Sequence, residues 1–157
     1  MKTTKILSLL LVIVLLSGCK RDNWLDWKMQ NEMWLAQNAK KEGVITTPTG
    51  LQYKCIDPGL NNGSARPDNA KIVTIDYTGQ LINDYVFDSA NGAIMQVNSV
   101  VAGFAEGLKK MHQQGIYDFY IPYYLGYGQS GNGTEGTEKF IPPYSTLIFR
   151  VHLRSVN

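Results

Sequence analysis

The chain has 157 residues, which is enough for one globular domain with short additions. Its formal net charge of +2 includes Lys2 and Lys5 of an N-terminal segment; without these two, the 15 basic side chains become 13 and balance the 13 acidic ones. A body near zero net charge gives no general electrostatic reason to bind nucleic acid, so that partner is set aside.

The first nineteen residues have the parts of a secretion signal in the usual order. Residues 1–5 are short and basic, and residues 6–16 are almost entirely Leu, Val and Ile. A bilayer-spanning helix needs about 20 apolar residues, so this run is too short to be a transmembrane anchor and is typical of a signal peptide. The run ends in Leu16-Ser17-Gly18-Cys19, which resembles the lipobox of bacterial lipoproteins.

That resemblance implies that residues 1–18 are a lipoprotein signal peptide and that Cys19 begins the mature chain and carries acyl groups. Each buried methylene contributes about 0.8 kcal/mol, so several acyl chains hold a protein on a membrane that it does not span. The expected location is the bacterial cell envelope, on the periplasmic side of a membrane or at the cell surface. The alternative is an ordinary signal peptide in which Cys19 is incidental.

One further cysteine, Cys55, remains. If Cys19 is lipidated, Cys55 has no partner within the chain, and a disulfide framework is impossible. Cys55 lies in the stretch 51–56, where alternate residues share one face of a strand. No activating neighbour is visible in the sequence, so we expect a small buried side chain rather than a reactive thiol.

Residues 22–41 are expected to form a helix within an N-terminal region, 19–49, that also holds a connector. Asp22 or Asn23 can cap its start, and Gly43 follows two lysines at its end. Its apolar positions include all three tryptophans of the chain, roughly on one stripe, namely Trp24, Trp27 and Trp34, with Leu25, Met29, Met33 and Leu35 between them. We expect this stripe to pack against the protein's own domain. The alternatives are that it forms a dimer surface or a membrane-facing arm.

The rest of the chain predicts several strands, one short helix and one long loop. Alternating apolar residues predict the last strand, where Leu147, Phe149, Val151 and Leu153 share one face. Further strands are expected at about 51–56, 70–81, 85–87 and 116–122, with a hairpin turn at 83–84, an amphipathic helix at 103–112 and a Gly-rich loop at 126–145. This order predicts an α+β domain in which a curved antiparallel sheet wraps around one short helix.

Four motifs follow one another in the same part of the chain. They read VTIDYTGQL at 73–81 with VFDS at 86–89, VVAGFAEGLKKM at 100–111, IPYYLGYG at 121–128 and FIPPYSTLIF at 140–149. In this order and spacing they resemble the FKBP-type peptidyl-prolyl isomerases over residues 50–157. Residues 38–44 and 49–53 resemble the segment that precedes the domain in bacterial envelope members, some of which dimerise through N-terminal helices. The resemblance implies an antiparallel β half-barrel around one helix, preceded by an N-terminal helix.

The resemblance also implies an activity, peptidyl-prolyl cis-trans isomerisation, on proline-containing polypeptides that are secreted or reside in the envelope. Rotation about an X-Pro bond faces a barrier of about 20 kcal/mol. No covalent bond is made or broken, so no nucleophile, metal or cofactor is expected. As the amide twists, its carbonyl becomes less polar, and an apolar pocket can hold that form better than the planar one. The alternative is a non-catalytic chaperone or peptide-binding module on the same scaffold.

By the same resemblance, the site has two sets of residues. The set assigned to catalysis is Tyr77, Phe87, Asp88, Val101 and Phe104, and the set assigned to substrate binding is Val100, Met95, Leu125, Tyr127, Ile141 and Phe149. Phe104 would be the floor, Val101 would offer its backbone N–H and Asp88 would be a polar wall. Plain core packing is the alternative for each aromatic residue, and a turn or cap is the alternative for Asp88.

Departures from the family pattern indicate a softer pocket and slower catalysis than in the best members. Many relatives carry Trp at the position of Phe104, and relatives often have Phe at that of Met95. Some have Tyr at the position of Leu125, although Leu is common there among bacterial members. The two histidines, His112 and His152, fall on unrelated elements, so we expect exposed side chains and neither a zinc site nor a Ser-His-Asp arrangement.

Overall fold

The computed structural model describes residues 23–60 and 66–157. The predicted signal peptide, Cys19 and Asp22 lie outside these ranges. Within them the elements, in chain order, are α1 (Asn23–Asn38), β1 (Val44–Thr46), β2 (Gln52–Asp57), β3 (Ile72–Gln80), β4 (Val86–Gln96), the 3-10 helix η1 (Val97–Ser99), α2 (Ala102–Leu108), β5 (Ile116–Ile121), the 3-10 helix η2 (Tyr123–Leu125) and β6 (Leu147–Val156).

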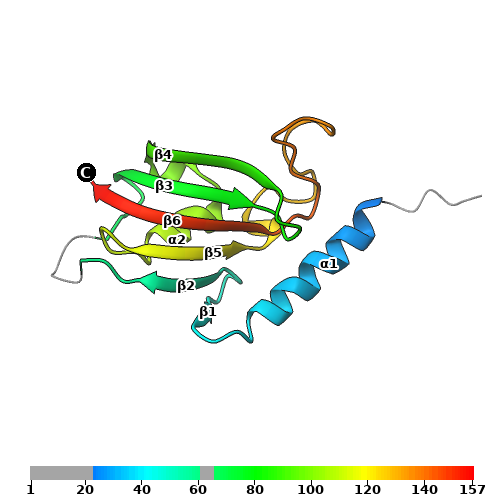
Figure 1. The fold of residues 1–157 in the computed structure, drawn as a ribbon, viewed down its shortest axis with the longest axis horizontal. Helices are drawn as coiled ribbons and strands as arrows, with labels where there is room; N and C mark the ends of the chain where they lie inside the picture. The colour runs from blue at the N-terminus through cyan, green and yellow to red at the C-terminus, as the bar shows by residue number, and fades with distance from the viewer. Residues whose placement is uncertain (1–22, 61–65) are drawn as a thin grey trace, which may run out of the picture.

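The six strands form one antiparallel sheet in the order β1-β2-β5-β6-β3-β4. Figure 1 shows this sheet curving around α2, with α1 set apart at one end. The register places Phe149 of β6 opposite Phe119 of β5 on one side and Gly79 of β3 on the other. The predicted α+β architecture, a curved antiparallel sheet around one short helix preceded by an N-terminal helix, is therefore confirmed.

The hydrophobic core lies between the sheet and α2. The apolar face predicted for the last strand is fully buried, since Leu147, Phe149, Val151 and Leu153 are at most 7 % exposed. From α2, Phe104 and Leu108 enter the same core. This interdigitation fixes the helix in the concavity of the sheet.

The helix expected at 22–41 ends earlier, at Asn38, and two elements of the following domain also differ clearly in length from the prediction. The helix predicted at 103–112 is shorter, because after Leu108 the chain turns with a hydrogen bond from Lys110 N–H to the Gly107 carbonyl, although Met111 beyond the turn is still buried. The short strand predicted at 85–87 extends to Gln96 as β4. Irregular register with β3 breaks the alternation that would have revealed the longer strand.

Helix α1 packs against the chain's own domain through its tryptophans. The Trp27 Nε1–H donates to Ser145 Oγ at 2.9 Å, and the rings of Trp24 and Trp34 lie 6.0 Å and 5.7 Å from those of Phe140 and Tyr120, centroid to centroid. The expected packing of the tryptophan stripe is thus what the structure shows. The structure does not show a dimer surface made by these three rings, because the rings already contact the domain.

A buried polar seam joins α1 to the domain. Asn31, 1 % exposed, donates from Nδ2 to the Trp27 carbonyl and accepts at Oδ1 from the Thr146 N–H at 2.7 Å. Asn38, also 1 % exposed, donates to Gln52 Oε1, and Gln52 donates to the Leu35 carbonyl. Because buried polar groups are costly unless paired, these bonds fix the position of the helix.

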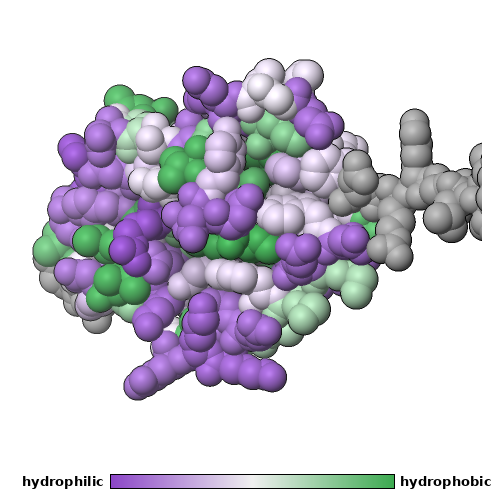
Figure 2. Space-filling model, turned by 45° about the vertical axis from the view of Figure 1, so that its right-hand side comes forward, coloured by the Kyte–Doolittle hydropathy of each residue, from purple (hydrophilic) through white to green (hydrophobic). Residues whose placement is uncertain are grey.

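The opposite face of α1 is apolar and open. Leu25, Met29 and Met33 recur every four residues and are each more than half exposed. Figure 2, which brings the α1 side forward, shows hydrophobic patches scattered among hydrophilic residues on this side of the molecule. Among the residues that the structure describes, no helix is long and apolar enough to cross a membrane.

Three predictions about single side chains are wrong. His152 is half-buried rather than exposed, with its Nδ1 3.4 Å from Oδ2 of Asp76. Cys55 is exposed, not buried, because β2 leaves the core towards its end, where its register with β5 slips between Cys55 and Asp57. His112 is half-buried rather than exposed. Its Nε2 lies 2.9 Å from Nη2 of Arg66, and its buried Nδ1 has no hydrogen-bond partner among the described residues.

Candidate active site

A cavity of about 310 Å³ opens at the N-terminal end of α2. Strands β3, β4 and β6 form one side, and the loop 126–146 overhangs it. Its lining residues are Tyr77, Phe87, Asp88, Met95, Ser99, Val100, Val101, Phe104, Tyr127, Asn132, Lys139, Ile141 and Phe149. The cavity is therefore apolar below and polar at its rim, as small ligand sites usually are.

Aromatic rings in edge-to-face contact make the floor. Phe104, 4 % exposed, has its ring centroid 4.8 Å from that of Phe149 and 6.2 Å from that of Tyr77. Phe87 meets Phe149 at 5.5 Å and nearly perpendicular. Such geometry is favourable for aromatic pairs and holds each ring in place, so the floor is a preformed apolar surface.

Gly79 makes room for this arrangement. A Cβ at this position would lie 2.6 Å from the Phe149 ring and 2.7 Å from the Phe87 ring, closer than real Cβ atoms come. The glycine therefore lets two rings from neighbouring strands approach the backbone of β3. The shape of the cavity depends on a residue that does not line it.

A carboxylate from β4, that of Asp88, stands on the wall of the cavity. Asp88 accepts a hydrogen bond from the Tyr77 hydroxyl at Oδ2, at 2.6 Å, and one from Lys139 Nζ at Oδ1, at 3.0 Å. Burial alone would raise the pKa of Asp88, but these two donors outweigh it and hold the pKa below its ordinary value. The carboxyl group is thus charged at neutral pH.

The tyrosines near Asp88 stay protonated. Burial raises the pKa of Tyr77 to about 12, with help from its hydrogen bond to Asp88 and the charge there. Burial, then the charge of Asp88, also raises the pKa of Tyr127. Both phenols are therefore neutral hydrogen-bond donors over the whole physiological range.

The backbone at the start of α2 supplies a donor to the cavity. Val101 is the N-cap of the helix, and its carbonyl accepts from the N–H groups of Phe104 and Ala105, each at 3.0 Å. No described residue accepts a hydrogen bond from the N–H of Val101 itself. Helix N-termini carry N–H groups without partners inside the helix, so this group is available to a bound carbonyl.

Of the eleven residues that the sequence assigned to the site, the structure brings all but Leu125 together in this cavity. Leu125 lies in η2 and packs against the start of α2, where a Cβ on Gly103 would come within 3.1 Å of the Leu125 Cβ. Its side chain thus lies outside the lining of this cavity, and its assignment to substrate binding stays a prediction.

Three lining residues escaped the sequence analysis, namely Ser99, Asn132 and Lys139. The last two belong to the long loop, where no periodic pattern indicates which side chains face inward. A two-residue bridge between Asn132 and Ile141, with N–H···O distances of 2.8 Å in both directions, closes the loop over the cavity. Within the described residues, no group of three or more His, Cys, Asp or Glu side chains could hold a metal ion.

Comparison with protein families agrees with the geometry of the cavity. Residues 63–154 match the model for FKBP-type peptidyl-prolyl cis-trans isomerases, and residues 23–55 match that for a domain amino-terminal to such isomerases. The chain belongs to the FKBP-type peptidyl-prolyl cis-trans isomerase family. The family match therefore includes the α1 region as well as the domain that carries the cavity.

Individual FKBP-type relatives agree with this membership. An outer membrane protein MIP from Legionella longbeachae is 38 % identical over 133 residues, covering 82 % of this chain and 54 % of its own. An FKBP-type 22 kDa isomerase from Escherichia coli is 42 % identical over 127 residues, covering 78 % and 58 %. The crystal structure of FkpA from Escherichia coli superposes with a TM-score of 0.76 at 31 % identity, covering 85 % and 60 %. The chain spans about half the length of the curated relatives it matches.

Proposed function

We propose that this protein is a peptidyl-prolyl cis-trans isomerase that assists the folding of proline-containing polypeptides in the bacterial cell envelope. The observation that carries the proposal is the aromatic cavity on Phe104, whose lining also holds the Asp88 carboxylate and Val101, a residue whose backbone N–H has no acceptor among the described residues. Residues 50–157 form the isomerase domain in this proposal.

The cavity can lower the barrier without covalent chemistry. A planar X-Pro amide is held by resonance, and twisting it costs about 18–20 kcal/mol. The proline ring would rest on Phe104 between Phe87 and Phe149, and the Val101 N–H would bond a carbonyl of the polypeptide. In this apolar surrounding the twisted, less polar amide is bound better than the planar one, and each 1.4 kcal/mol of preference is about tenfold in rate.

The polar wall keeps the substrate in register. The Tyr77 hydroxyl and Lys139 Nζ both donate to the Asp88 carboxylate, which lines the cavity. No proton is transferred in the reaction, and Tyr77 and Asp88 keep the same protonation states throughout. They orient the X-Pro amide of the substrate and shape the electrostatic field around it.

The test is the cis-trans exchange rate of an Ala-Pro peptide measured by NMR with the full chain in detergent. We expect clear acceleration by wild type, its loss in the double variant Phe87→Ala, Asp88→Val, and its retention in Thr78→Ala, which alters an exposed residue of β3. A folded wild type that leaves the exchange rate unchanged would contradict the proposal.

The same proposal places the protein on a membrane by a lipid on Cys19, after removal of residues 1–18, with residues 19–49 as the lipidated N-terminus, helix and connector. Support comes from the basic, apolar and lipobox order of the segment and from a relative that is named an outer membrane protein. Labelling cells with an alkyne fatty acid should tag wild type but not Cys19→Ser. Equal labelling of both would contradict lipidation at this residue.

We further propose a homodimer through the helix at 22–41, formed by the outer face of α1. Its support is that α1 is apolar on two sides, one packed on the domain and one, at Leu25, Met29 and Met33, open. Light scattering should give a dimer for wild type and a monomer when these three residues become Gln. A monomeric wild type would contradict it.

A non-catalytic chaperone or peptide-binding module is not favoured. That alternative relied partly on the Trp-rich helix as a binding arm, and its tryptophans are occupied by contacts with Ser145, Phe140 and Tyr120.

A further inference from the structure

Strand β4 changes its alternation between its two ends. From Ser89 to Gln96 its exposed side chains are those of Ser89, Asn91, Ile94 and Gln96. In a regular strand every second side chain faces the same side, but Asn91 and Ile94 are three positions apart. The strand therefore contains one extra residue between them, so that odd-numbered residues face solvent before this point and even-numbered residues face solvent after it.

The extra residue belongs to a β-bulge opposite β3. Two residues of β4, Asn91 and Gly92, together oppose the single residue Asp76 of β3. The pairs that flank the bulge are Ile75 with Ala93 and Tyr77 with Ala90. Gly92 has φ +69°, in the left-handed region, and a Cβ there would meet nothing within 4 Å. The backbone conformation of the bulge, and not crowding, thus favours glycine.

The bulge determines which residue of β4 faces the cavity. On one side of it Met95 lines the cavity, and on the other side Asp88, paired with Gly79, lines it as well. Met95 and Asp88 are seven positions apart, an odd number, so they could not share a face of an uninterrupted strand. Without the bulge, the place of Asp88 would fall to Ser89, and Asp88 would turn to the outer face of the sheet.

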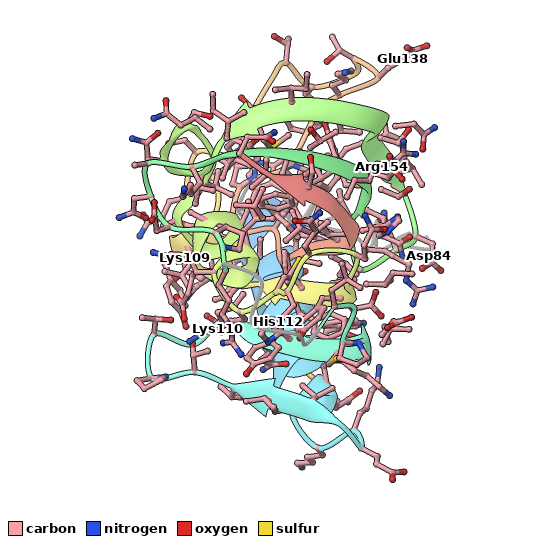
Figure 3. The ribbon with its side chains drawn as sticks, turned by 90° about the vertical axis from the view of Figure 1, so that its left-hand side faces the viewer. Asp84, Lys109, Lys110, His112, Glu138 and Arg154 are labelled. Carbon is pink, nitrogen blue, oxygen red and sulfur yellow. The ribbon has the colours of Figure 1, made fainter. Side chains whose placement is uncertain are left out.

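Asp76 ties this bulge to the rest of the sheet from the outer face. Its Oδ1 accepts a hydrogen bond from the Gly92 N–H at 2.7 Å, and its Oδ2 accepts one from Arg154 Nε of β6, also at 2.7 Å. His152 Nδ1 lies 3.4 Å from the same Oδ2. Figure 3 shows Arg154 and Lys109, the latter at the end of α2, on opposite sides of the sheet. The Asp76 carboxylate thus joins β4 to β6 across β3, on the side away from the cavity.

The Asp76 carboxylate is charged at neutral pH and partly shielded from water. Burial alone would raise its pKa, but the hydrogen bonds from Arg154 and Gly92 outweigh burial and hold the pKa below its ordinary value. Its side chain is 21 % exposed. Hydrogen bonds to a charged acceptor are stronger than those between neutral groups, so this carboxylate is a firm anchor for the Gly92 N–H.

We propose that Asp76 is a positioning residue, which through its hydrogen bond to Gly92 fixes the bulge that keeps Asp88 facing the cavity. This inference rests on the proposed isomerase function, in which the Asp88 carboxylate orients the amide of the substrate. Asp76 itself is not among the residues that line the cavity, and it acts on the substrate only through the conformation of β4.

The experiment follows two quantities with the full chain in detergent. They are the pKa of Asp88, from a pH titration of its side-chain ¹³C signal, and the cis-trans exchange rate of an Ala-Pro peptide. In Asp76→Ala the bulge loses its tie, and Asp88 is no longer fixed against the Tyr77 hydroxyl that lowers its pKa. The pKa of Asp88 should rise towards its ordinary value, and the acceleration should fall by about three- to tenfold.

A matched control is Asp118→Ala. Asp118 of β5 also binds an arginine of β6 on the outer face, at 2.8 Å from Arg150 Nε, and the register of these two strands is regular. Both variants remove one negative charge and one outer ion pair, but only Asp76→Ala releases a bulge. Asp118→Ala should therefore leave the pKa of Asp88 and the exchange rate at their wild-type values.

Two further variants address the hydrogen bond itself. Asp76→Asn keeps an oxygen that can accept from the Gly92 N–H and should restore most of both wild-type values. Gly92→Ala strains the bulge from the other strand, because a residue with a Cβ disfavours the left-handed region. It should change both quantities in the same direction as Asp76→Ala, and it provides the test if Asp76→Ala does not fold.

The outcomes separate the inference from the proposed function. If wild type does not accelerate the exchange, the isomerase function fails, and the pKa of Asp88 still decides whether Asp76 positions the carboxylate. Values in Asp76→Ala equal to those in Asp118→Ala would overturn the inference. A slower exchange with an unchanged pKa of Asp88 would overturn it as well, because the effect would not pass through Asp88.

Discussion

The cavity and the α1 seam lie on two sides of the same loop and handle polar groups in opposite ways. In the seam, Asn31 and Asn38 are 1 % exposed and hydrogen-bond to other parts of the chain, although Asn38 Oδ1 has no partner among the described residues. In the cavity, the Asp88 carboxylate is paired with Tyr77 and Lys139 but still reaches solvent, and the Val101 N–H has no acceptor among the described residues. Polar groups paired internally stabilise a fold, whereas polar groups left at the edge of an apolar surface are able to bind a ligand.

The comparison predicts that each region can be damaged without the other. Changes in the cavity should reduce isomerisation more than stability accounts for, and changes in the seam should reduce stability but leave the chemistry intact.

The largest effect is expected from Gly79→Ala. The added Cβ would meet the rings of Phe149 and Phe87 at distances below 3.0 Å, so both rings must move and the floor changes shape. Overpacking of this kind typically costs about 1–3 kcal/mol, and we expect isomerase activity to fall by at least about tenfold, since each 1.4 kcal/mol of lost transition-state binding is tenfold. Urea unfolding and peptide exchange rates measure the two effects. Activity equal to that of Thr78→Ala would show that the ring positions do not matter.

A smaller effect, on stability alone, is expected from Asn31→Ala. The change removes the side-chain oxygen that accepts a hydrogen bond from the Thr146 N–H. This hydrogen bond is buried and 2.7 Å long. An unsatisfied buried donor costs about 1–3 kcal/mol, and the free energy of unfolding should fall by that amount while the exchange rate of an Ala-Pro peptide stays at the wild-type value. Gln30→Ala, at an exposed position of α1, is the control. A parallel loss of activity would show that the seam and the cavity are coupled.

The smallest effect is expected from pH. Because the pKa of Asp88 is lower in the folded protein than its ordinary value, this group stabilises the fold above its unfolded pKa, and that contribution is lost as pH falls through the folded pKa. The stability difference between wild type and Asp88→Asn should be constant at pH 6–8 and shrink below about pH 4. Urea unfolding at several pH values measures it, with Glu135→Gln as the control. A difference that grows in acid would reverse the assigned direction.

Much of the domain could be predicted from the sequence because its pattern is local. Leu147 to Leu153 alternate strictly, and this strand is buried on the predicted face. The composition of the cavity came from the family resemblance instead, since Tyr77, Phe104 and Phe149 meet only through the pairing of distant strands and the placement of α2. Periodicity alone cannot bring such residues together.

What the sequence did not reveal depends on contacts between elements. Asn31 and Asn38 look like surface residues of a helix until Thr146 and Gln52 are brought against them. Cys55 follows the alternation of its strand, but the strand runs past the edge of the core. Lys139 lies in a Gly-rich loop with no period, and only the folded loop places it against Asp88.

The most direct test of the central claim, that the cavity binds the polypeptide and α1 does not, is an NMR titration of the ¹⁵N-labelled chain with an Ala-Pro tetrapeptide. The account predicts that the largest shift changes fall on the amides of Val101 and its neighbours at the start of α2, with those of Leu25, Met29 and Met33 unmoved. Shift changes concentrated on α1, with the Val101 amide unaffected, would contradict it.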